Sequence, residues 1–167
     1  MRTMALVVAI LAAQMSLAFA QETSFLSIPS SGFTSRTVTE NLGYEGNTSG
    51  TARLFDNSVL MFAPVYLPHG ATVTGLRCGG MTPSDEKRVE FTLRRNQPQI
   101  ANVDMATVMT TFEGLGFQHP ETASITSPVV DNATFNYYIV AAARHIDVGR
   151  CRNCVVGYCR IRYTVGQ

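Results

Sequence analysis

Cysteine is the residue type in this sequence with the clearest potential for chemistry, and its spacing is uneven. Cys151, Cys154 and Cys159 lie within nine residues near the C-terminus, whereas Cys78 stands alone. A Cys-x-x-Cys pair can bind zinc, exchange disulfides with other proteins, or close a small structural ring. The choice among these uses depends on the compartment of the protein and on the sequence around the cysteines.

A second motif upstream suggests catalysis. The segment HPE at 119–121, followed by CRNC at 151–154, resembles the zinc-deaminase pattern, in which H-x-E and P-C-x-x-C supply the zinc ligands and a proton-shuttling glutamate. Here Arg150 takes the place of the proline, and strand-like sequence follows both motifs where a deaminase has helices. We therefore do not expect a deaminase.

A structural zinc site is the next alternative. It would need Cys151, Cys154 and Cys159 together with a fourth ligand, because structural zinc is four-coordinate. If residues 155–165 form a regular strand, however, Cys159 points into the core. A redox role for Cys151 and Cys154 also lacks support, since no thioredoxin-like βαβ pattern surrounds them.

The N-terminal residues decide between these uses of cysteine. Arg2 precedes a short apolar run, and Ala18 and Ala20 stand where signal peptidase reads small residues. This pattern predicts a signal peptide over residues 1–20. The mature chain, residues 21–167, is then secreted, periplasmic or displayed at the cell surface, and no later segment is apolar enough to cross a bilayer.

Export into an oxidising space favours disulfides. Alternation along the predicted strands places Cys78 and Cys159 on core-facing positions, so these two can pair. Cys151 and Cys154 would then close a small ring at the entrance to the last strand. The longer bond would enclose about 80 residues and contribute about 4 kcal/mol by restricting the unfolded chain. Four cysteines allow three pairings, and this one is our prediction.

The charged residues balance once the leader is removed. The full chain has 13 Lys and Arg against 12 Asp and Glu, so the loss of Arg2 leaves 12 of each. A neutral mature chain gives no electrostatic reason to expect a nucleic-acid partner. The chain also has no tryptophan, which removes one common stacking platform for sugars.

Arginine is concentrated on the last predicted strand and just before it. Between residues 144 and 162, Asp147 alone offsets five arginines. Cross-strand pairing with acids on the same face would explain such a group structurally. The functional alternative is an acidic partner, either a polyanionic extracellular glycan or the next subunit of a homo-oligomer. The candidate partner-binding residues are Arg144, Arg150, Arg152, Arg160 and Arg162.

Other catalytic signatures are missing from the sequence. It contains no G-x-S-x-G nucleophile elbow and no H-E-x-x-H motif. Asp85, Glu86 and Glu90 sit in or beside a polar turn with basic neighbours, which is typical of a solvated hairpin. Calcium at a sandwich loop could use Asp56 or Asp131, but each precedes an asparagine in turn-like sequence, where Asx turns explain them. We expect no catalytic residue and no cofactor.

Period-two alternation dominates the mature sequence, and no convincing helix interrupts it. RVEFTLRR at 88–95 shows the pattern most cleanly, with Val89, Phe91 and Leu93 on one side. The same reasoning predicts strands over 102–113, 122–128, 133–144 and 155–165, the last with Cys159 inward and Arg160 outward.

This spacing predicts the fold class. About eight short strands separated by polar turns indicate one all-β domain over residues 21–167, an antiparallel β-sandwich of jelly-roll type. Residues 21–51 are rich in Ser, Thr, Gly and Asn, so we expect an extended, loop-rich N-terminal segment there.

Three segments resemble a known group of proteins. They are FAPVYLPHGATVTGL at 62–76, VDNATFNYYIV at 130–140 and GYCRIRYT at 157–164. Their pattern, P-V-x-L-P-x-G-A-x-V-T, then a DN…YY strand, then I-x-Y-T, resembles uncharacterised secreted single-domain proteins of environmental bacteria. The resemblance implies a secreted β-sandwich and assigns no catalytic residue. The cysteine-rich ending departs from the commoner pattern.

Three functions fit these features. The leading one is a secreted, non-enzymatic structural or adhesive protein that assembles at the cell surface or in the extracellular matrix, with residues 21–51 able to add a strand to a neighbouring sheet. A carbohydrate-binding module is one alternative, and an unrecognised extracellular hydrolase with convergent acids or histidines in a cleft is another. The candidate sugar-stacking residues are Tyr44, Tyr66, Tyr137, Tyr138 and Tyr158.

The intact mass of natively secreted, unreduced protein tests the compartment and the cysteine assignment together. We expect a chain that begins at Gln21, with all four cysteines oxidised to disulfides and no zinc bound. Four free thiols or a stoichiometric zinc ion would contradict both assignments.

Overall fold

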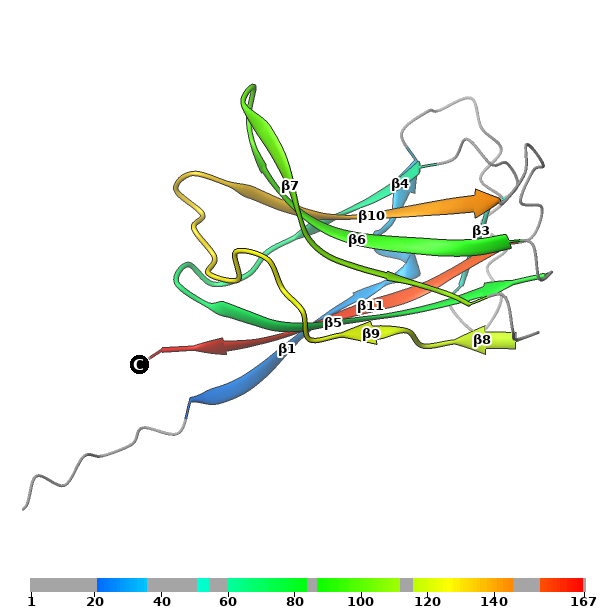
Figure 1. Ribbon diagram of the computed structural model, residues 1–167, viewed down its shortest axis with the longest axis horizontal. Helices are drawn as coiled ribbons and strands as arrows, with labels where there is room; N and C mark the ends of the chain where they lie inside the picture. Colours follow the sequence, from blue (N-terminus) through cyan, green and yellow to red (C-terminus); the bar gives the residue numbers. More distant parts are fainter. Residues whose placement is uncertain are drawn as a thin grey trace, which may run out of the picture.

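The computed structural model describes residues 21–35, 51–54, 60–83, 87–111, 116–145 and 154–166 (Figure 1). The predicted antiparallel β-sandwich is confirmed, because these residues form two sheets and one short 3-10 turn, η1 (Ser30–Gly32). The strands are β1 (Glu22–Pro29), β2 (Thr34–Ser35), β3 (Ala52–Leu54), β4 (Leu60–Val65), β5 (Thr72–Thr82), β6 (Lys87–Gln97), β7 (Ala101–Met109), β8 (Gly116–Gln118), β9 (Glu121–Thr122), β10 (Asn136–His145) and β11 (Cys154–Val165). Seven of them have six or more residues, and β2, β3, β8 and β9 are short.

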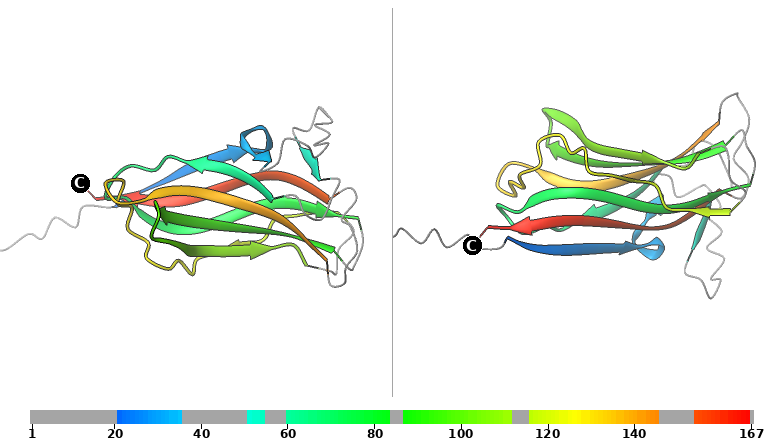
Figure 2. Two further views of the ribbon diagram at one scale, coloured as in Figure 1. Left: turned by 90° about the horizontal axis from the view of Figure 1, so that it is seen from above. Right: turned by 60° about the horizontal axis from the view of Figure 1, so that its bottom comes forward.

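Strands that follow one another in the sequence mostly belong to different sheets. The first sheet has the order β1-β11-β5-β8, with β3 beside β11 and β9 beside β5. The second sheet has the order β2-β4-β10-β6-β7. Figure 2 shows the two layers, with β11 between β1 and β5. The chain crosses from one sheet to the other at most connections, as in a jelly roll.

The inward side chains of both sheets form one core. Val89, Phe91 and Leu93 of β6 are fully buried, as the alternation predicted. From the first sheet, Leu76 and Ile161 lie opposite each other on β5 and β11 and are also buried. Burial of each large apolar side chain contributes about 1.5–3 kcal/mol, so this layer is the main source of stability.

The middle of strand β10 is buried on both faces, because its outward residues Val140 and Ala142 are flanked by side chains of the strands on either side. It pairs with β4 on one side and β6 on the other, and adjacent residues Ile139 and Val140 are both buried.

Pro64 lies in β4 at a position where β10 pairs on one side and no strand of the described ranges pairs on the other. An edge position tolerates proline because no ladder hydrogen bond is lost there.

The N-terminal segment is more regular than its composition suggests. β1 pairs with β11 along its whole length, from Glu22 opposite Val165 to Pro29 opposite Tyr158. Thr23 and Ser27 face outward, while Ile28 is buried in the core. Polar residues on the solvent face of a strand therefore made the segment resemble a loop in the sequence.

Two N-terminal predictions fall outside the described residues. They are the signal peptide over residues 1–20 and the stretch 36–50 of the extended segment. Within the described ranges, no helix is long and apolar enough to cross a membrane.

The predicted strand over 122–128 is mostly a loop. Only Thr122 belongs to a strand, at the end of β9. Ser127 adopts a positive φ of 51°, and Pro128 has no N–H to donate. Thr126 instead donates its N–H to the backbone of β7 at 2.8 Å. Turn-forming residues therefore outweigh the apolar alternation here.

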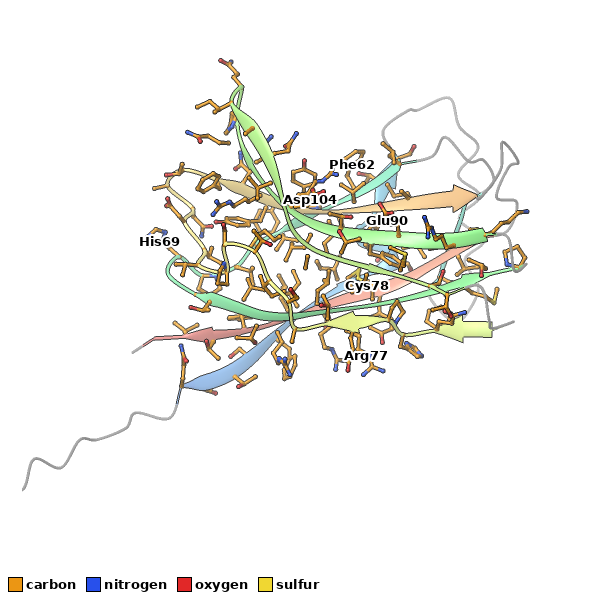
Figure 3. All side chains as sticks on the ribbon, in the orientation of Figure 1. Phe62, His69, Arg77, Cys78, Glu90 and Asp104 are labelled. Carbon is orange, nitrogen blue, oxygen red and sulfur yellow. A yellow bond between two sulfur atoms is a disulfide. The ribbon has the colours of Figure 1, made fainter. Side chains whose placement is uncertain are left out.

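The predicted bond between Cys78 and Cys159 is confirmed. The two Cα atoms are 4.1 Å apart, and both cysteines are fully buried between the sheets, where Figure 3 labels Cys78. This bond removes Cys159 from the zinc alternative. Cys154 also belongs to a disulfide, but its predicted partner Cys151 lies outside the described residues, so that pairing stays a prediction.

Replacing Cys78 and Cys159 together by alanine is expected to lower the free energy of unfolding by about 4 kcal/mol. The reason is that a loop closed across 81 positions no longer restricts the unfolded chain. Urea unfolding of the double variant beside the native protein measures the loss. Replacing Cys151 and Cys154 is the control, because so small a ring contributes about 2 kcal/mol or less. Equal losses for the two pairs would contradict this account.

Candidate functional site

The disulfide sets which side chains meet on the outer face of the first sheet, the face turned away from the second sheet. Cys78 and Cys159 lie opposite each other, so the next pair along the two strands is Arg77 and Arg160. Successive side chains of a strand point to opposite faces, so both arginines are outside when the cysteines are inside. Figure 3 shows Cys78 between the sheets and Arg77 on the other side of β5.

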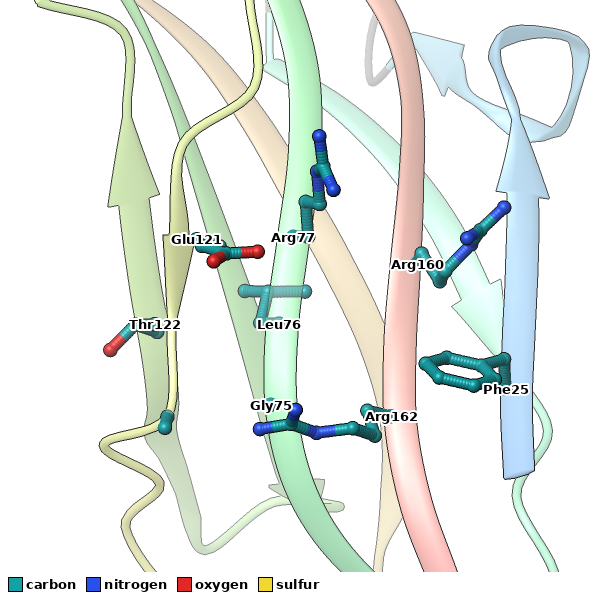
Figure 4. A pocket seen from close by; sticks show the side chains of 9 residues that line it. Phe25, Gly75, Leu76, Arg77, Glu121, Thr122, Arg160 and Arg162 are labelled. Carbon is teal, nitrogen blue, oxygen red and sulfur yellow. The ribbon is translucent and has the colours of Figure 1, made fainter. Parts of the chain in front are cut away.

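A groove of about 420 Å³ opens at this place on the outer face (Figure 4). Its floor is β5, where Gly75 lies opposite Arg162 of β11. One wall is β9, whose Glu121 lies opposite Arg77. Its lining includes Phe25 of β1, Gly75 and Arg77 of β5, Glu121 of β9, and Arg160 and Arg162 of β11.

Arg162 is held across β5 by Thr74. Its Nε donates to Thr74 Oγ1 at 3.2 Å, and its Nη2 donates to the Thr74 carbonyl oxygen at 3.0 Å. Thr74 has no partner residue in the ladder between β5 and β11. This irregularity leaves its carbonyl oxygen available to accept the hydrogen bond from Arg162 Nη2. Gly75 supplies the room, because a Cβ there would lie 3.2 Å from Nη2. These two bonds orient the guanidinium, and Figure 4 shows it reaching across β5 at Gly75.

Arg77 and Arg160 lie at opposite positions of β5 and β11, and Figure 4 shows the Arg160 side chain extending toward Phe25 of β1. The Arg160 guanidinium carbon lies 5.7 Å from the centroid of the Phe25 ring, within cation–π range. Among the described residues, no carboxylate oxygen lies within 4.0 Å of either guanidinium. Glu121 is the one acidic residue that lines the groove in this part of the chain, against three arginines. The groove is therefore positively charged.

An aromatic cluster continues the groove along β11 toward β8. The rings of Phe117 and His119 have centroids 5.1 Å apart, and those of His119 and Tyr158 are 5.8 Å apart. His119 Nδ1 and Tyr158 Oη form a hydrogen bond of 3.0 Å. Tyr158 precedes Arg160 by two positions and shares its face. We call the whole surface the outer strip: Phe25, Arg77, Phe117, His119, Tyr158, Arg160 and Arg162, with Glu121 at its edge.

Two glycines let the aromatic cluster lie flat on the sheet. A Cβ on Gly79 would lie 2.6 Å from Cε1 of both Phe117 and Tyr158. A Cβ on Gly157 would lie 2.2 Å from Phe117 Cζ. Gly157 is skipped in the pairing of β11 with β5, which marks a bulge. A side chain at either position would displace the rings.

Two of the five predicted arginines meet in this groove. Arg160 and Arg162 line it side by side on β11. Arg144 lies in β10 of the second sheet, and its side chain is outside the described part of the chain. Arg150 and Arg152 also lie outside it, so their predicted role stays a prediction.

Arg77 completes the arginine group, although the sequence-based assignment left it out. The signal was present in the predicted disulfide. If Cys78 lies opposite Cys159 on antiparallel strands, counting one residue away along each strand places Arg77 opposite Arg160.

The predicted tyrosines do not share one face. Tyr158 belongs to the outer strip, whereas Tyr137 is buried and its Oη accepts a backbone N–H at 2.7 Å. Tyr66 is 81% exposed in the connection between β4 and β5. Tyr138 lies on the second sheet, and Tyr44 lies outside the described residues.

The outer face of the second sheet pairs its own polar groups. The rings of Tyr138 and Phe62 are 6.0 Å apart, and Tyr138 Oη donates to Asn102 Oδ1 at 3.1 Å. Arg94 forms an ion pair with Asp104 on the next strand, and hydrogen bonding to that carboxylate raises the pKa of Arg94. This arginine is neutralised within the sheet, in contrast to those of the outer strip.

The calcium candidate Asp131 belongs to the turn before β10. Its Oδ1 accepts the Ala133 N–H at 3.0 Å, which is the predicted Asx turn. A hydrogen bond from the Thr134 side chain is the main cause that lowers the pKa of Asp131. In the described ranges, no group of three or more His, Cys, Asp or Glu side chains is placed to hold a metal ion. Asp56 lies outside those ranges.

The HPE motif contributes to the outer strip and its edge. His119 is hydrogen-bonded to Tyr158, and Glu121 lies in the groove wall opposite Arg77. Both residues that suggested zinc chemistry therefore face the same open surface as the arginines.

Known proteins resemble the chain in fold. No protein-family model matches it, and no curated protein does. The CBM36-1 domain of a multidomain xylanase from the hindgut metagenome of Trinervitermes trinervoides superposes with a TM-score of 0.55 at 14% identity, covering 83% of this chain and 96% of that domain. The carbohydrate-binding module CBM36 in complex with calcium and xylotriose gives 0.53 at 12% identity, covering 81% and 98%. The xylan-binding module CBM15 gives 0.51 at 8% identity, covering 87% and 99%. These likenesses show a shared two-sheet fold.

Gly79→Ala is expected to displace the rings of Phe117 and Tyr158, and so to break the hydrogen bond to His119. Overpacking of this kind costs about 1–3 kcal/mol of unfolding free energy. Urea unfolding and the NMR resonances of the His119 ring measure the two effects. Gly166→Ala is the control, because a Cβ there would meet nothing within 4 Å. Unchanged His119 resonances in the Gly79 variant would contradict the role of this glycine.

Proposed function

We propose that the chain is an exported, non-catalytic carbohydrate-binding protein and that the outer strip is its binding surface. The observation that carries the proposal is an arginine-lined groove and an aromatic cluster on the same outer face of the first sheet. The similar solved structures support it, because they include carbohydrate-binding modules, one of them with xylotriose and another described as xylan-binding.

The strip offers the two kinds of contact that a sugar needs. The apolar C–H face of a sugar ring can pack on Phe117, which is 39% exposed, or on Phe25, which is 57% exposed at the other end. Hydroxyl groups can donate to the Glu121 carboxylate and accept from the arginine side chains. These groups stand on paired strands, so little ordering is needed on binding.

The adhesive role favoured by the sequence is compatible with this surface, since an adhesive protein can hold its target through a glycan. Strand donation is a weaker idea. β1 is already paired along its length with β11, so donating residues 22–29 into a neighbour's sheet would first break this ladder. Because β1 ends the first sheet, its outer edge could pair with another copy without that loss.

The hydrolase alternative lacks a second acid. Glycoside hydrolysis generally uses two carboxyl groups on either side of the bond. In the described part of the chain, Glu121 is the one carboxylate in the groove lining. A binding role needs no such pair.

Calcium accompanies the sugar in one of the similar structures. Calcium takes roughly six to eight oxygen ligands, several of them carboxylates. The described residues do not fit this requirement, because the groove contains Glu121 alone and Asp131 is engaged in its own turn. We derive no calcium-dependent step.

Screening the purified mature protein on a glycan array at low salt tests the proposal. We expect binding that survives EDTA. Phe25→Ala should weaken it about tenfold, because aromatic contacts at a binding surface often contribute more than about 1 kcal/mol to binding. Tyr66→Ala is the control, an exposed tyrosine outside the outer strip. Binding to no glycan, or equal losses in the two variants, would contradict the proposal.

A further inference from the structure

We propose that the groove selects acidic sugars, and that Arg160, Arg162 and Arg77 bind their carboxylate or sulfate groups. This inference rests on the proposed carbohydrate-binding function and names the class of glycan. It is carried by the position of the three arginines on the sheet.

Arg77 and Arg160 lie directly opposite each other on neighbouring strands. Like charges in such positions destabilise a sheet. Among the described residues, no carboxylate lies within 4.0 Å to neutralise either one. An anion bound in the groove beside them would reduce this repulsion, which a neutral sugar cannot do.

Arg162 adds a preorganised donor two positions along β11. Guanidinium has five N–H donors, and two of the Arg162 donors are engaged with Thr74, which leaves three. Its orientation is therefore fixed before a ligand arrives. A planar guanidinium in a fixed position suits two-point recognition of a carboxylate or sulfate.

The spacing of the outer strip suits a chain of sugars. Tyr158, Arg160 and Arg162 are alternate residues of one strand, so the distance from the first to the last is about 13 Å. Phe25 lies beside the arginines and the aromatic cluster lies beyond them. An oligosaccharide can therefore pack one ring on an aromatic side chain while an acidic group on the next ring reaches an arginine.

Glu121 makes the two sides of the groove differ in charge. It lies opposite Arg77, on the β9 side of the groove, whereas Arg160 and Arg162 lie on the β11 side. Its negative charge repels an acidic group from the β9 wall. The anionic group of the ligand therefore sits nearer to β11.

Isothermal titration calorimetry with matched pairs of oligosaccharides tests the inference on the full mature chain. The pairs are oligogalacturonate with its methyl ester, and a sulfated carrageenan oligosaccharide with its desulfated form. We expect the acidic member of at least one pair to bind tenfold or more tightly, because its charged group adds charge-assisted hydrogen bonds to the arginines, and to weaken as NaCl is raised. The preferred pair identifies carboxylate or sulfate as the group recognised.

Single substitutions locate the contact. Arg160→Gln and Arg162→Gln should each weaken acidic binding about tenfold, with little effect on the neutral member. Glu121→Gln should strengthen acidic binding, because it removes the repulsion. Arg94→Gln is the control, since it changes the net charge equally on the opposite sheet. Unaltered unfolding curves show that each variant is folded.

The outcomes separate the two proposals. Equal affinity for both members of each pair would overturn acidic selection and leave carbohydrate binding standing. Binding to no glycan would overturn both. Equal losses in the Arg160 and Arg94 variants would show a general charge effect and overturn the assigned site. Polyglutamate that binds as tightly as oligogalacturonate would overturn the assignment to a sugar, because it supplies carboxylates without sugar rings.

Discussion

The covalent bond between Cys78 and Cys159 is the constraint on which the outer face depends. In a pair of strands one fixed contact determines every other contact, and a slip by one residue would turn all side chains of that strand to the opposite face. With the cysteines joined inside the sandwich, Arg77 and Arg160 must lie outside and side by side. Their mutual repulsion acts against this arrangement, and the disulfide and the buried core oppose that repulsion.

Two irregularities bound the stretch in which this register holds. Between the bulge at Gly157 and the skipped Thr74, five consecutive residue pairs join β11 to β5. Each irregularity also shapes the surface. The bulge at Gly157 leaves space for the ring of Phe117, and Thr74 offers the carbonyl that orients Arg162. The residues that interrupt the ladder are therefore those that build the groove and its aromatic extension.

Much of this architecture could be predicted from the sequence, because alternation indicates which face of a strand is buried and the predicted signal peptide implies an oxidising compartment. Those two signals predicted the sandwich, the inward residues of β6 and the disulfide. Once Cys78 is paired with Cys159, counting residues along the two strands gives the register, so the position of Arg77 opposite Arg160 could also be predicted. The contribution of β8 and His119 was not, since β8 has three residues, too few to show a period, and its partner β5 is distant in sequence. β1 was underestimated because its serine and threonine residues obscure the apolar alternation.

The pairing of β1 with β11 also has a consequence for the connectivity of the fold. Glu22 lies opposite Val165, and neighbouring strands are about 4.8 Å apart, so a linker of a few residues could join the ends of these two strands. Figure 1 shows both ends on the same side of the sandwich. New ends could be opened in the turn between β6 and β7 near Gln99, on the other sheet. The fold therefore permits circular permutation. The new chain ends would lie on the sheet that does not carry the groove, so the protein could be attached to a support through them with the groove left accessible.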